Sequence, residues 1–451
     1  MQSTTTELLQ FINKSKSMYH AVSNIKEILS EHGYQELKEQ EEFHLVLGGK
    51  YFVTRNDSTI AAFELPEGQI HGFHIIAAHS DSPTFKVKEN PEMKSEGYIR
   101  LNTEKYGGMI MNSWLDRPLS VAGRIALKEN GKIITKLVDV DRDLLVIPSV
   151  AIHMNRDANS GMNYDASVDT VPLFAETPWS DGNHAQNICG KTEIVETNQK
   201  ISCGKSTTEQ PSFIGEVAKS AGVQADEILG HDLFVYVRQE GRVIGANSEY
   251  ILSPKLDDLQ CAFAAVQAMV NSKPENYINI TTIFDNEEVG SGTRQGADST
   301  FFDDLLTRIM ESLGKNKSWL IQMIADSFMI SADNAHAVHP NHPEHADSNN
   351  RPYMNRGIVL KYHGGQKYTT DAYSAAVIKD LCGRAGVPYQ VFTNKSNKIG
   401  GSTLGNISQA HVSIASADIG LPQLAMHSAV ETGGVRDTEY AVKMFEEFYR
   451  E

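Results

Sequence analysis

Residues 72–83 read GFHIIAAHSDSP, and the predicted fold rests on the pattern they show. The apolar run has the density of a strand buried on both faces, and it leads into His79 and then Asp81. Four further segments carry acidic or imidazole side chains, most of them just after an apolar run. These are Asp257 in SPKLDDLQ, Glu287 and Glu288 after ITTIFDN, Asp333 after FMISA and His427 after LPQLAM.

Strand-like and helix-like segments alternate from about residue 245 onward, which predicts an α/β fold. We expect a mostly parallel central sheet with helices on both of its faces. Helices are expected over residues 1–34, 256–270, 300–313, 373–382 and 438–449. Strands are expected over residues 44–55, 58–65, 72–78, 277–285, 327–333 and 421–426. The candidate helix caps are Thr369, Thr370, Asp371 and Asp437.

Residues 98–237 have a different texture from the rest of the chain. An Asn130-Gly131 turn between two strand-like runs predicts a β-hairpin. Residues 144–154 look like another strand, and residues 155–211 are so poor in apolar side chains that they predict a long surface loop. We therefore expect a catalytic-type domain over residues 1–94 and 238–451, interrupted by an inserted β-rich domain over residues 95–237.

The composition limits the possible partners. The 451 residues carry a formal net charge of −16, from 41 basic and 57 acidic side chains. This charge argues against a nucleic-acid or anionic-membrane partner, because both need a basic surface. No window approaches the ~18 apolar residues of a membrane-spanning helix, and the first residues lack the pattern of a secretory signal. We expect a soluble, cytoplasmic protein.

Cysteine is rare in this chain. The four cysteines form neither a CxxC pair nor a zinc-finger spacing, and they are Cys189, Cys203, Cys261 and Cys382. This usage is typical of a reducing compartment with buried thiols, and a structural disulfide is the alternative.

The acidic and imidazole residues have the types and positions that a pair of metal ions needs. The carboxyl ends of parallel strands meet at one edge of an open α/β sheet, where ligands bind. Asp257 instead precedes a helix. Imidazole and carboxylate suit zinc, and Mn²⁺ or Co²⁺ can substitute. Five ligands for two ions require one shared residue, and an aspartate bridges through its two oxygens, so we expect hydrolysis by metal-activated water.

Further roles follow from neighbouring positions. Glu287 and Glu288 point in different directions on an extended segment, so one can bind metal while the other acts as general base. Asp81 can accept a hydrogen bond from the His79 imidazole and fix its tautomer. Each residue alone has a plainer interpretation, such as a helix cap for Asp257 or a solvated face for the glutamate pair.

Histidines recur every three residues in HAVHPNHPEH, residues 336–345. Two prolines prevent a regular helix from presenting them on one face. We expect a loop near the active site, with His336 and His339 nearest Asp333 and available to substrate. A third, regulatory metal is the alternative.

The motifs AAHSDSP, SPKLDDLQ, FDNEEVGS, SADNAHAVHPN and LAMHSAVET together resemble the aspartyl aminopeptidase family of dinuclear zinc exopeptidases, over nearly the whole chain. The resemblance implies two zinc ions per subunit. His79 and Asp333 are implied as ligands of one ion, and Asp257 as the bridge to the other. Glu288 and His427 are implied as the ligands of the second ion.

The resemblance also implies Glu287 as catalytic base and Asp81 as the support of His79. The substrates implied are peptides with a free N-terminus. The family combines an α/β peptidase domain with a β-rich oligomerisation domain, and its members assemble as tetrahedral dodecamers. A histidine of the β-rich domain reaches a neighbouring subunit's active site, and IPSVAIHMNR assigns that role to His153.

Preference for an N-terminal Asp or Glu is implied by Lys361, which matches a family lysine linked to the acidic side chain. A point charge in a cleft suits a carboxylate. The segment HGGQ that follows Lys361 is particular to this chain, so a neutral or broad N-terminal preference is the alternative. The same ligand order would also suit a dizinc carboxypeptidase or deacylase, although the extra domain of those enzymes usually lies later in the chain. A non-catalytic assembly scaffold with this fold is the remaining interpretation.

Overall fold

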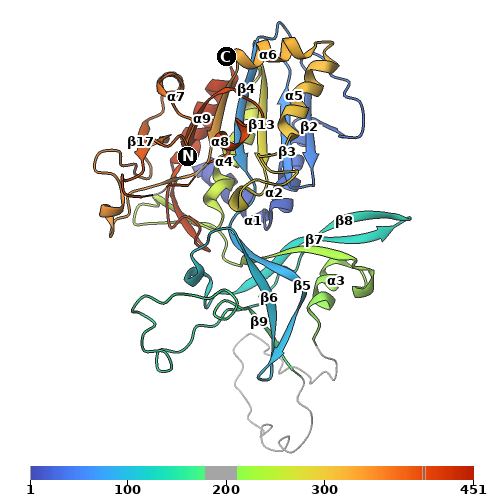
Figure 1. The fold of residues 1–451 in the computed structure, drawn as a ribbon, viewed down its shortest axis with the longest axis vertical. Coiled ribbons are helices and arrows are strands. Elements are labelled where there is room, and N and C mark those ends of the chain that lie inside the picture. The colour runs from blue at the N-terminus through green and yellow to red at the C-terminus, as the bar shows by residue number, and fades with distance from the viewer. Residues whose placement is uncertain (1, 178–210, 399, 402) are drawn as a thin grey trace, which may run out of the picture.

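The computed structural model describes residues 2–177, 211–398, 400–401 and 403–451. Within these residues a nine-stranded sheet with helices on both sides forms the larger part of the molecule, and a six-stranded sheet projects from one end of it (Figure 1). The predicted mixed α/β class is therefore confirmed.

The nine-stranded sheet has the order β1-β2-β3-β13-β4-β14-β18-β16-β17. The central strands β13, β4, β14 and β18 are parallel, whereas β3 beside β13 and β16 beside β18 are antiparallel. The strands are β1 Gln35–Leu37, β2 Lys50–Arg55, β3 Thr59–Glu64, β4 Gly72–His79, β13 Tyr277–Phe284, β14 Phe328–Ala332, β16 Ile358–Tyr362, β17 Tyr389–Thr393 and β18 Ala415–Gly420.

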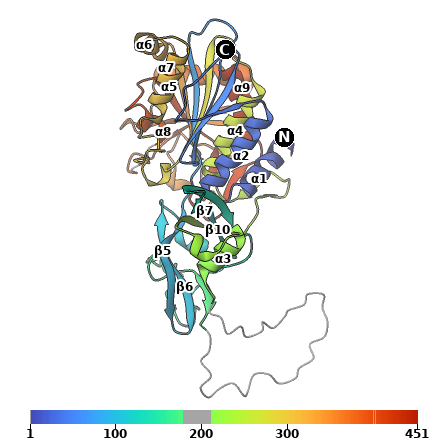
Figure 2. The ribbon, with the colours of Figure 1, turned by 90° about the vertical axis from the view of Figure 1, so that its right-hand side faces the viewer.

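Helices cover both faces of this sheet because its central strands are apolar on both sides (Figure 2). In β4, Ile76 and Ala78 pack with the helices of one face, and Ile75 and Ala77 pack with those of the other. The first face carries α1 Gln2–Lys14, α2 Met18–Glu31, α4 Leu256–Asn271, α7 Ala372–Ala385 and α9 Asp437–Tyr449. The second carries α5 Phe301–Ser312, α6 Lys317–Ala325 and α8 Leu404–Ser408.

The six-stranded sheet is antiparallel, in the order β8-β7-β10-β5-β6-β9, and has its own apolar core. Its strands are β5 Thr84–Ser95, β6 Tyr98–Tyr106, β7 Leu119–Glu129, β8 Lys132–Asp139, β9 Leu173–Glu176 and β10 Gly230–Val237. The predicted hairpin joins β7 to β8, and Asn130 and Gly131 both have the positive φ that its tight turn requires. Because β5 begins at Thr84, this sheet starts earlier in the chain than residue 95.

A third sheet, β11-β12-β20-β19-β15, lies entirely in the C-terminal half of the chain. Its strands are β11 Arg242–Ile244, β12 Tyr250–Ser253, β15 Ala335–His336, β19 Pro422–Leu424 and β20 Glu431–Gly434. Short 3-10 helices are η1 Met111–Trp114, η2 Ala225–Glu227, η3 Glu287–Val289 and η4 Pro343–His345.

The residues up to about Tyr34 are helical as predicted, in two helices, α1 and α2, separated at Ser15, whose hydroxyl donates to the Phe11 carbonyl. Two other local predictions were wrong. Residues 144–154 form only isolated bridges, since Pro148 has no N–H to donate and the residues after it are exposed. Residues 44–49 are not strand.

The helix caps gave mixed results. Asp371 caps α7 as predicted, accepting from the Ser374 N–H. Asp437 does not cap α9, because its buried carboxylate accepts from the N–H groups of Asn355 and Gly357 instead. An unexpected helix, α3 Phe213–Ala221, begins just after the predicted loop of residues 155–211.

Cys261 and Cys382 are buried free thiols, as predicted. Cys189 and Cys203 lie outside the described residues. Among the residues that the structure describes, no helix has the length and apolar character needed to cross a membrane.

Candidate active site

The predicted site residues converge because the strands that precede them end at one edge of the nine-stranded sheet. His79 is the last residue of β4, and Asp333 directly follows the neighbouring β14. Glu287 and Glu288 open η3, just after β13, the neighbour on the other side of β4. Asp257 lies at the start of α4, which packs over β4 and β13.

The structure brings these side chains close enough to share metal ions. In each of three overlapping groups, one donor atom per residue lies within 4.8 Å of the others. The groups are His79 with Asp257 and Asp333, His79 with Glu287 and Glu288, and Asp257 with Glu288 and His427.

Asp257 belongs to two of these groups, and its two carboxylate oxygens face different histidines. Oδ1 lies 3.6 Å from His79 Nε2, and Oδ2 lies 3.4 Å from His427 Nε2. Glu288 Oε1 lies 3.4 Å from the same His427 nitrogen. Burial alone would raise the pKa of Asp257, but the neighbouring imidazoles of His427 and His79 lower it, so this carboxylate is charged at neutral pH.

An observation that does not depend on sequence motifs also indicates that these side chains bind divalent metal ions. Asp257 Oδ1 and Glu288 Oε1 are buried oxygens without a hydrogen-bond partner in the described part of the chain. Burying a carboxylate oxygen without a partner is costly, so such oxygens need a cation. With Glu287 and Asp333 beside them, the carboxylates outnumber the nearby cationic groups, and bound divalent ions would balance this charge.

Glu287 lines a pocket of about 330 Å³ together with Asp257 and Asp333. Burial raises the pKa of Glu287 to about 8, and the nearby charges of Asp333 and Asp81 act in the same direction. A carboxyl whose pKa lies near neutrality can both accept and return a proton.

Asp81 supports the site at several points. Its Oδ1 lies 3.4 Å from His79 Nδ1, and its backbone carbonyl lies 3.1 Å from that nitrogen. The same carboxylate accepts from the N–H groups of Glu287 and Glu288, each at 3.2 Å. Tyr106, the last residue of β6, also donates its hydroxyl to Asp81, at 2.8 Å. The Asp81 carboxylate lies beside the His79 imidazole as predicted, but the hydrogen bond from this ring goes to the Asp81 backbone carbonyl. The contacts between Asp81 and η3 were not predicted.

Lys361 lies inside the pocket. Its side chain is only 4% exposed, and its ammonium lies 3.6 Å from Asp333 Oδ1 and 5.5 Å from the centre of the Tyr368 ring. Burial alone would lower the pKa of Lys361, but the Asp333 carboxylate raises it, so the lysine stays charged. His79, His336, Phe392, Thr403, Met426 and His427 also line the pocket.

The other candidate substrate residues lie in different places. His336 lines the pocket beside Phe392, and burial by surrounding protein lowers its pKa although its outer edge is exposed. His339 is exposed and does not line the pocket. His153 is exposed in a turn rather than in a strand, and it does not line the pocket either.

Sequence reasoning missed Glu431, the first residue of β20. Its Oε1 accepts from the His427 N–H at 2.7 Å, and its Oε2 accepts from the Asp257 N–H at 3.0 Å. Burial raises the pKa of Glu431 to about 8, and the charge of Asp257 adds to this shift. The only signal was its position in the SAVET motif after His427.

Residues that follow β6 also hold His427 in place. Its Nδ1 hydrogen-bonds with the Gly108 carbonyl at 2.5 Å, and its own carbonyl accepts from the Ile110 N–H at 3.0 Å. His427 has a φ of 66°, an uncommon backbone conformation for a residue with a side chain. The surrounding contacts therefore fix an orientation that the local backbone alone would not favour.

Comparison with known proteins agrees with this geometry. A sequence model of the family described as "Aminopeptidase I zinc metalloprotease (M18)" matches residues 11–449. A Clostridium novyi (strain NT) protein named probable M18 family aminopeptidase 2 is 44% identical, with 98% of each chain covered. A Schizosaccharomyces pombe protein named aspartyl aminopeptidase 1 is 36% identical, with 100% of this chain and 95% of its own covered.

Solved structures share the fold over nearly the whole chain. A chain of the Ape4 and Nbr1 complex superposes with a TM-score of 0.90 at 34% identity, covering 99% of this chain and 85% of that chain. A chain of the S. cerevisiae mApe1 dodecamer gives 0.80 at 29% identity, covering 99% and 96%. An M18 aminopeptidase from Thermotoga maritima, at 22% identity, gives 0.82, covering 100% and 96%, and shows the same fold.

The motif resemblance and the predicted class of enzyme, a zinc-dependent aminopeptidase, are confirmed by these matches. They extend across both the large sheet and the six-stranded sheet. The chain therefore belongs to the M18 family of aminopeptidase I zinc metalloproteases.

Proposed function

We propose that this aminopeptidase hydrolyses the N-terminal peptide bond with water activated by two zinc ions. His79 and Asp333 would hold one ion, Glu288 and His427 the other, and Asp257 both. The observation that carries this proposal is the pair of Asp257 oxygens, each facing a different histidine. When bound, such ions polarise a substrate carbonyl and lower the pKa of water, and Mn²⁺ or Co²⁺ can substitute.

Glu287 is proposed as the general base. It removes a proton from the attacking water and delivers this proton to the amine that leaves. Its raised pKa matches both steps, because a carboxylate of low pKa would be too weak a base to accept the proton from water. Asp81 keeps Glu287 in position through the backbone of η3 and orients the His79 ring.

Preference for an N-terminal Asp or Glu is proposed from Lys361, a charged ammonium inside the pocket. The name of the S. pombe relative, aspartyl aminopeptidase 1, supports this preference. The alternative is a neutral or broad preference, and the ion pair between Lys361 and Asp333 favours it, because part of the lysine charge is already balanced.

Self-association, as a dodecamer, is proposed from the likeness to the mApe1 dodecamer. The six-stranded sheet, whose strands lie between Thr84 and Val237, would supply the contacts. His153 lies in an exposed apolar stretch, with Ile152 at 47% and Met154 at 83% exposure, and such a stretch suits burial against another subunit. We propose that His153 reaches a neighbouring active site there, and that the enzyme works in the cytoplasm.

One experiment tests the reaction and the preference together. Turnover of dipeptides that differ in the N-terminal residue would be measured with added zinc, manganese or cobalt. N-acetylated versions of the same dipeptides serve as controls. The proposal requires hydrolysis of free-amine substrates, with Asp and Glu fastest. Selective removal of the acetyl group would instead support a deacylase, and absence of all turnover would support a scaffold.

A further inference from the structure

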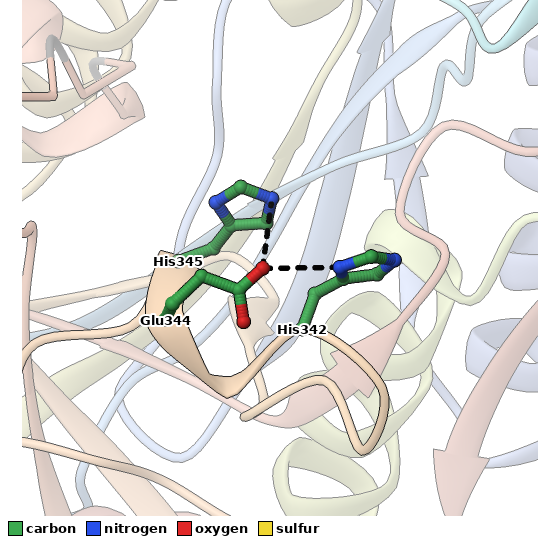
Figure 3. Close-up of side chains that lie close together, drawn as sticks. All are labelled: His342, Glu344 and His345. Atoms are coloured by element: carbon green, nitrogen blue, oxygen red, sulfur yellow. Dashed lines mark hydrogen bonds and ion pairs between the residues drawn. The ribbon is translucent and has the colours of Figure 1, made fainter.

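The histidine-rich segment carries a cluster that the catalytic chemistry does not use. His342, Glu344 and His345 lie together on the surface (Figure 3). Glu344 Oε1 lies 3.1 Å from His342 Nδ1 and 3.9 Å from His345 Nε2. One donor atom from each residue lies within 4.8 Å of the other two. None of the three residues lines the catalytic pocket.

The local backbone explains why the two imidazoles meet. Pro343 begins the 3-10 turn η4, and the His345 N–H donates to the His342 carbonyl. Side chains three residues apart lie on one side of a 3-10 turn. The two rings accordingly stack, with centroids 5.6 Å apart and planes inclined by 29°. The prolines exclude a regular helix, as expected, but Pro343 favours a turn that presents two of the histidines together.

The loop is held in this shape by contacts outside the cluster. The Arg351 guanidinium donates to the carbonyls of Pro343 and Asp347, at 3.0 and 2.6 Å. The Lys395 ammonium donates to the Glu344 carbonyl at 2.9 Å. A ligand that binds the three side chains therefore has little backbone to order, which lowers the entropic cost of binding.

The chemistry of the cluster matches a borderline metal ion. Two imidazoles and one carboxylate are a known ligand set for zinc, with the remaining position open to water. Ligands at 2.0–2.1 Å from a tetrahedral ion stand about 3.4 Å apart, and the observed 3.1 and 3.9 Å lie on either side of that value. The Glu344 carboxylate pairs with these imidazoles and with no lysine or arginine among the residues described.

We propose that His342, Glu344 and His345 form a surface site for a divalent ion of the zinc, nickel and copper class. The site is separate from the catalytic pocket. A bound ion would hold the two ends of the η4 turn together. Lys395, in the segment after β17, already connects that segment to this loop through its hydrogen bond to the Glu344 carbonyl. Binding at this surface site does not depend on how many ions the catalytic pocket holds.

Equilibrium dialysis of the full chain against buffered free zinc, followed by metal analysis, tests this site. The double variant His342→Gln with His345→Gln should bind one zinc ion per chain fewer than the wild type. His44→Gln, which removes an exposed histidine elsewhere, is the matched control and should bind as the wild type does. Equal zinc content in the double variant and the wild type across the titration would overturn the proposal.

Copper binding gives a second, spectroscopic reading. With one Cu²⁺ added per zinc-loaded chain, the wild type should show electron paramagnetic resonance couplings from two imidazole nitrogens, and the double variant should lose them. The single variant Glu344→Gln, which removes no histidine, should weaken zinc binding at this site if the double variant fails to fold. Unchanged binding in a folded Glu344→Gln protein and an unchanged copper spectrum in the double variant would each contradict the site.

Discussion

Glu431 offers a sharp test of the site because one carboxylate ties two proposed metal ligands together. It accepts from the backbone N–H groups of His427 and Asp257 through different oxygens. Glu431→Gln keeps the size of the side chain but leaves one oxygen, so an amide NH₂ must face one of the two N–H donors. One ligand segment then loses its anchor.

The size of the effect follows from this lost contact. A divalent ion bound beside Glu431 would favour the charged form of its carboxylate. A hydrogen bond to a charged acceptor contributes about 1.5–3 kcal/mol. Since about 1.4 kcal/mol corresponds to a factor of ten, zinc affinity should fall by roughly 10- to 100-fold. Groups that position metal ligands commonly have effects of this size.

Competition with a chromophoric zinc chelator measures this affinity directly. Glu311→Gln, on the exposed side of α5, is the control and should bind zinc as the wild type does. Circular dichroism would establish that both variants fold. A folded Glu431→Gln protein whose zinc affinity falls by less than about threefold, or ~0.7 kcal/mol, would refute the proposed anchoring role.

Three further outcomes are expected. Glu287→Gln should lower kcat by about 10²–10⁴ with unchanged zinc content, and full turnover would exclude it as the base. Lys361→Met should lower kcat/KM for N-terminal Asp peptides by at least about tenfold relative to Leu peptides, because the buried pair between the Lys361 ammonium and the substrate carboxylate is lost. An unchanged ratio would contradict a role of Lys361 in recognising the acidic side chain. When a chelator has removed the metal, Glu287 and Glu431 have pKa values raised to about 8 in the folded protein, whereas in the unfolded chain they lose their protons near pH 4–5. The free energy of unfolding of the metal-free protein therefore falls as pH rises through about 8. The drop in Tm on chelation should thus be larger at about pH 8.5 than at about pH 6, and scanning calorimetry showing equal drops would oppose this.

The sequence predicts the centre of the large sheet well because its central strands are apolar on both faces. A run such as residues 72–78 has few alternatives to a buried strand, and the polar residue that ends it must then lie at the sheet edge. This reasoning found His79, Asp333 and the pair Glu287 and Glu288.

The supporting residues could not be found in the same way. Glu431 lies in the short strand β20, and its role depends on pairing with β12 and β19, which are remote in sequence or too short to show a period. Tyr106 reaches Asp81 only because β6 ends beside η3. Such contacts depend on tertiary packing, which hydrophobic periodicity does not encode.

The contacts made by the end of β6 limit how this protein can be dissected. The Tyr106 hydroxyl at the end of β6 and the Gly108 carbonyl just after it hold Asp81 and the His427 ring. A shortened protein made by excising residues 95–237 would keep every proposed metal ligand. It would lose the groups that hold His427 and Asp81, and Asp81 in turn orients His79. The large sheet alone therefore lacks groups that position the proposed site. Shortened versions of this protein should retain the strand and turn at residues 98–114.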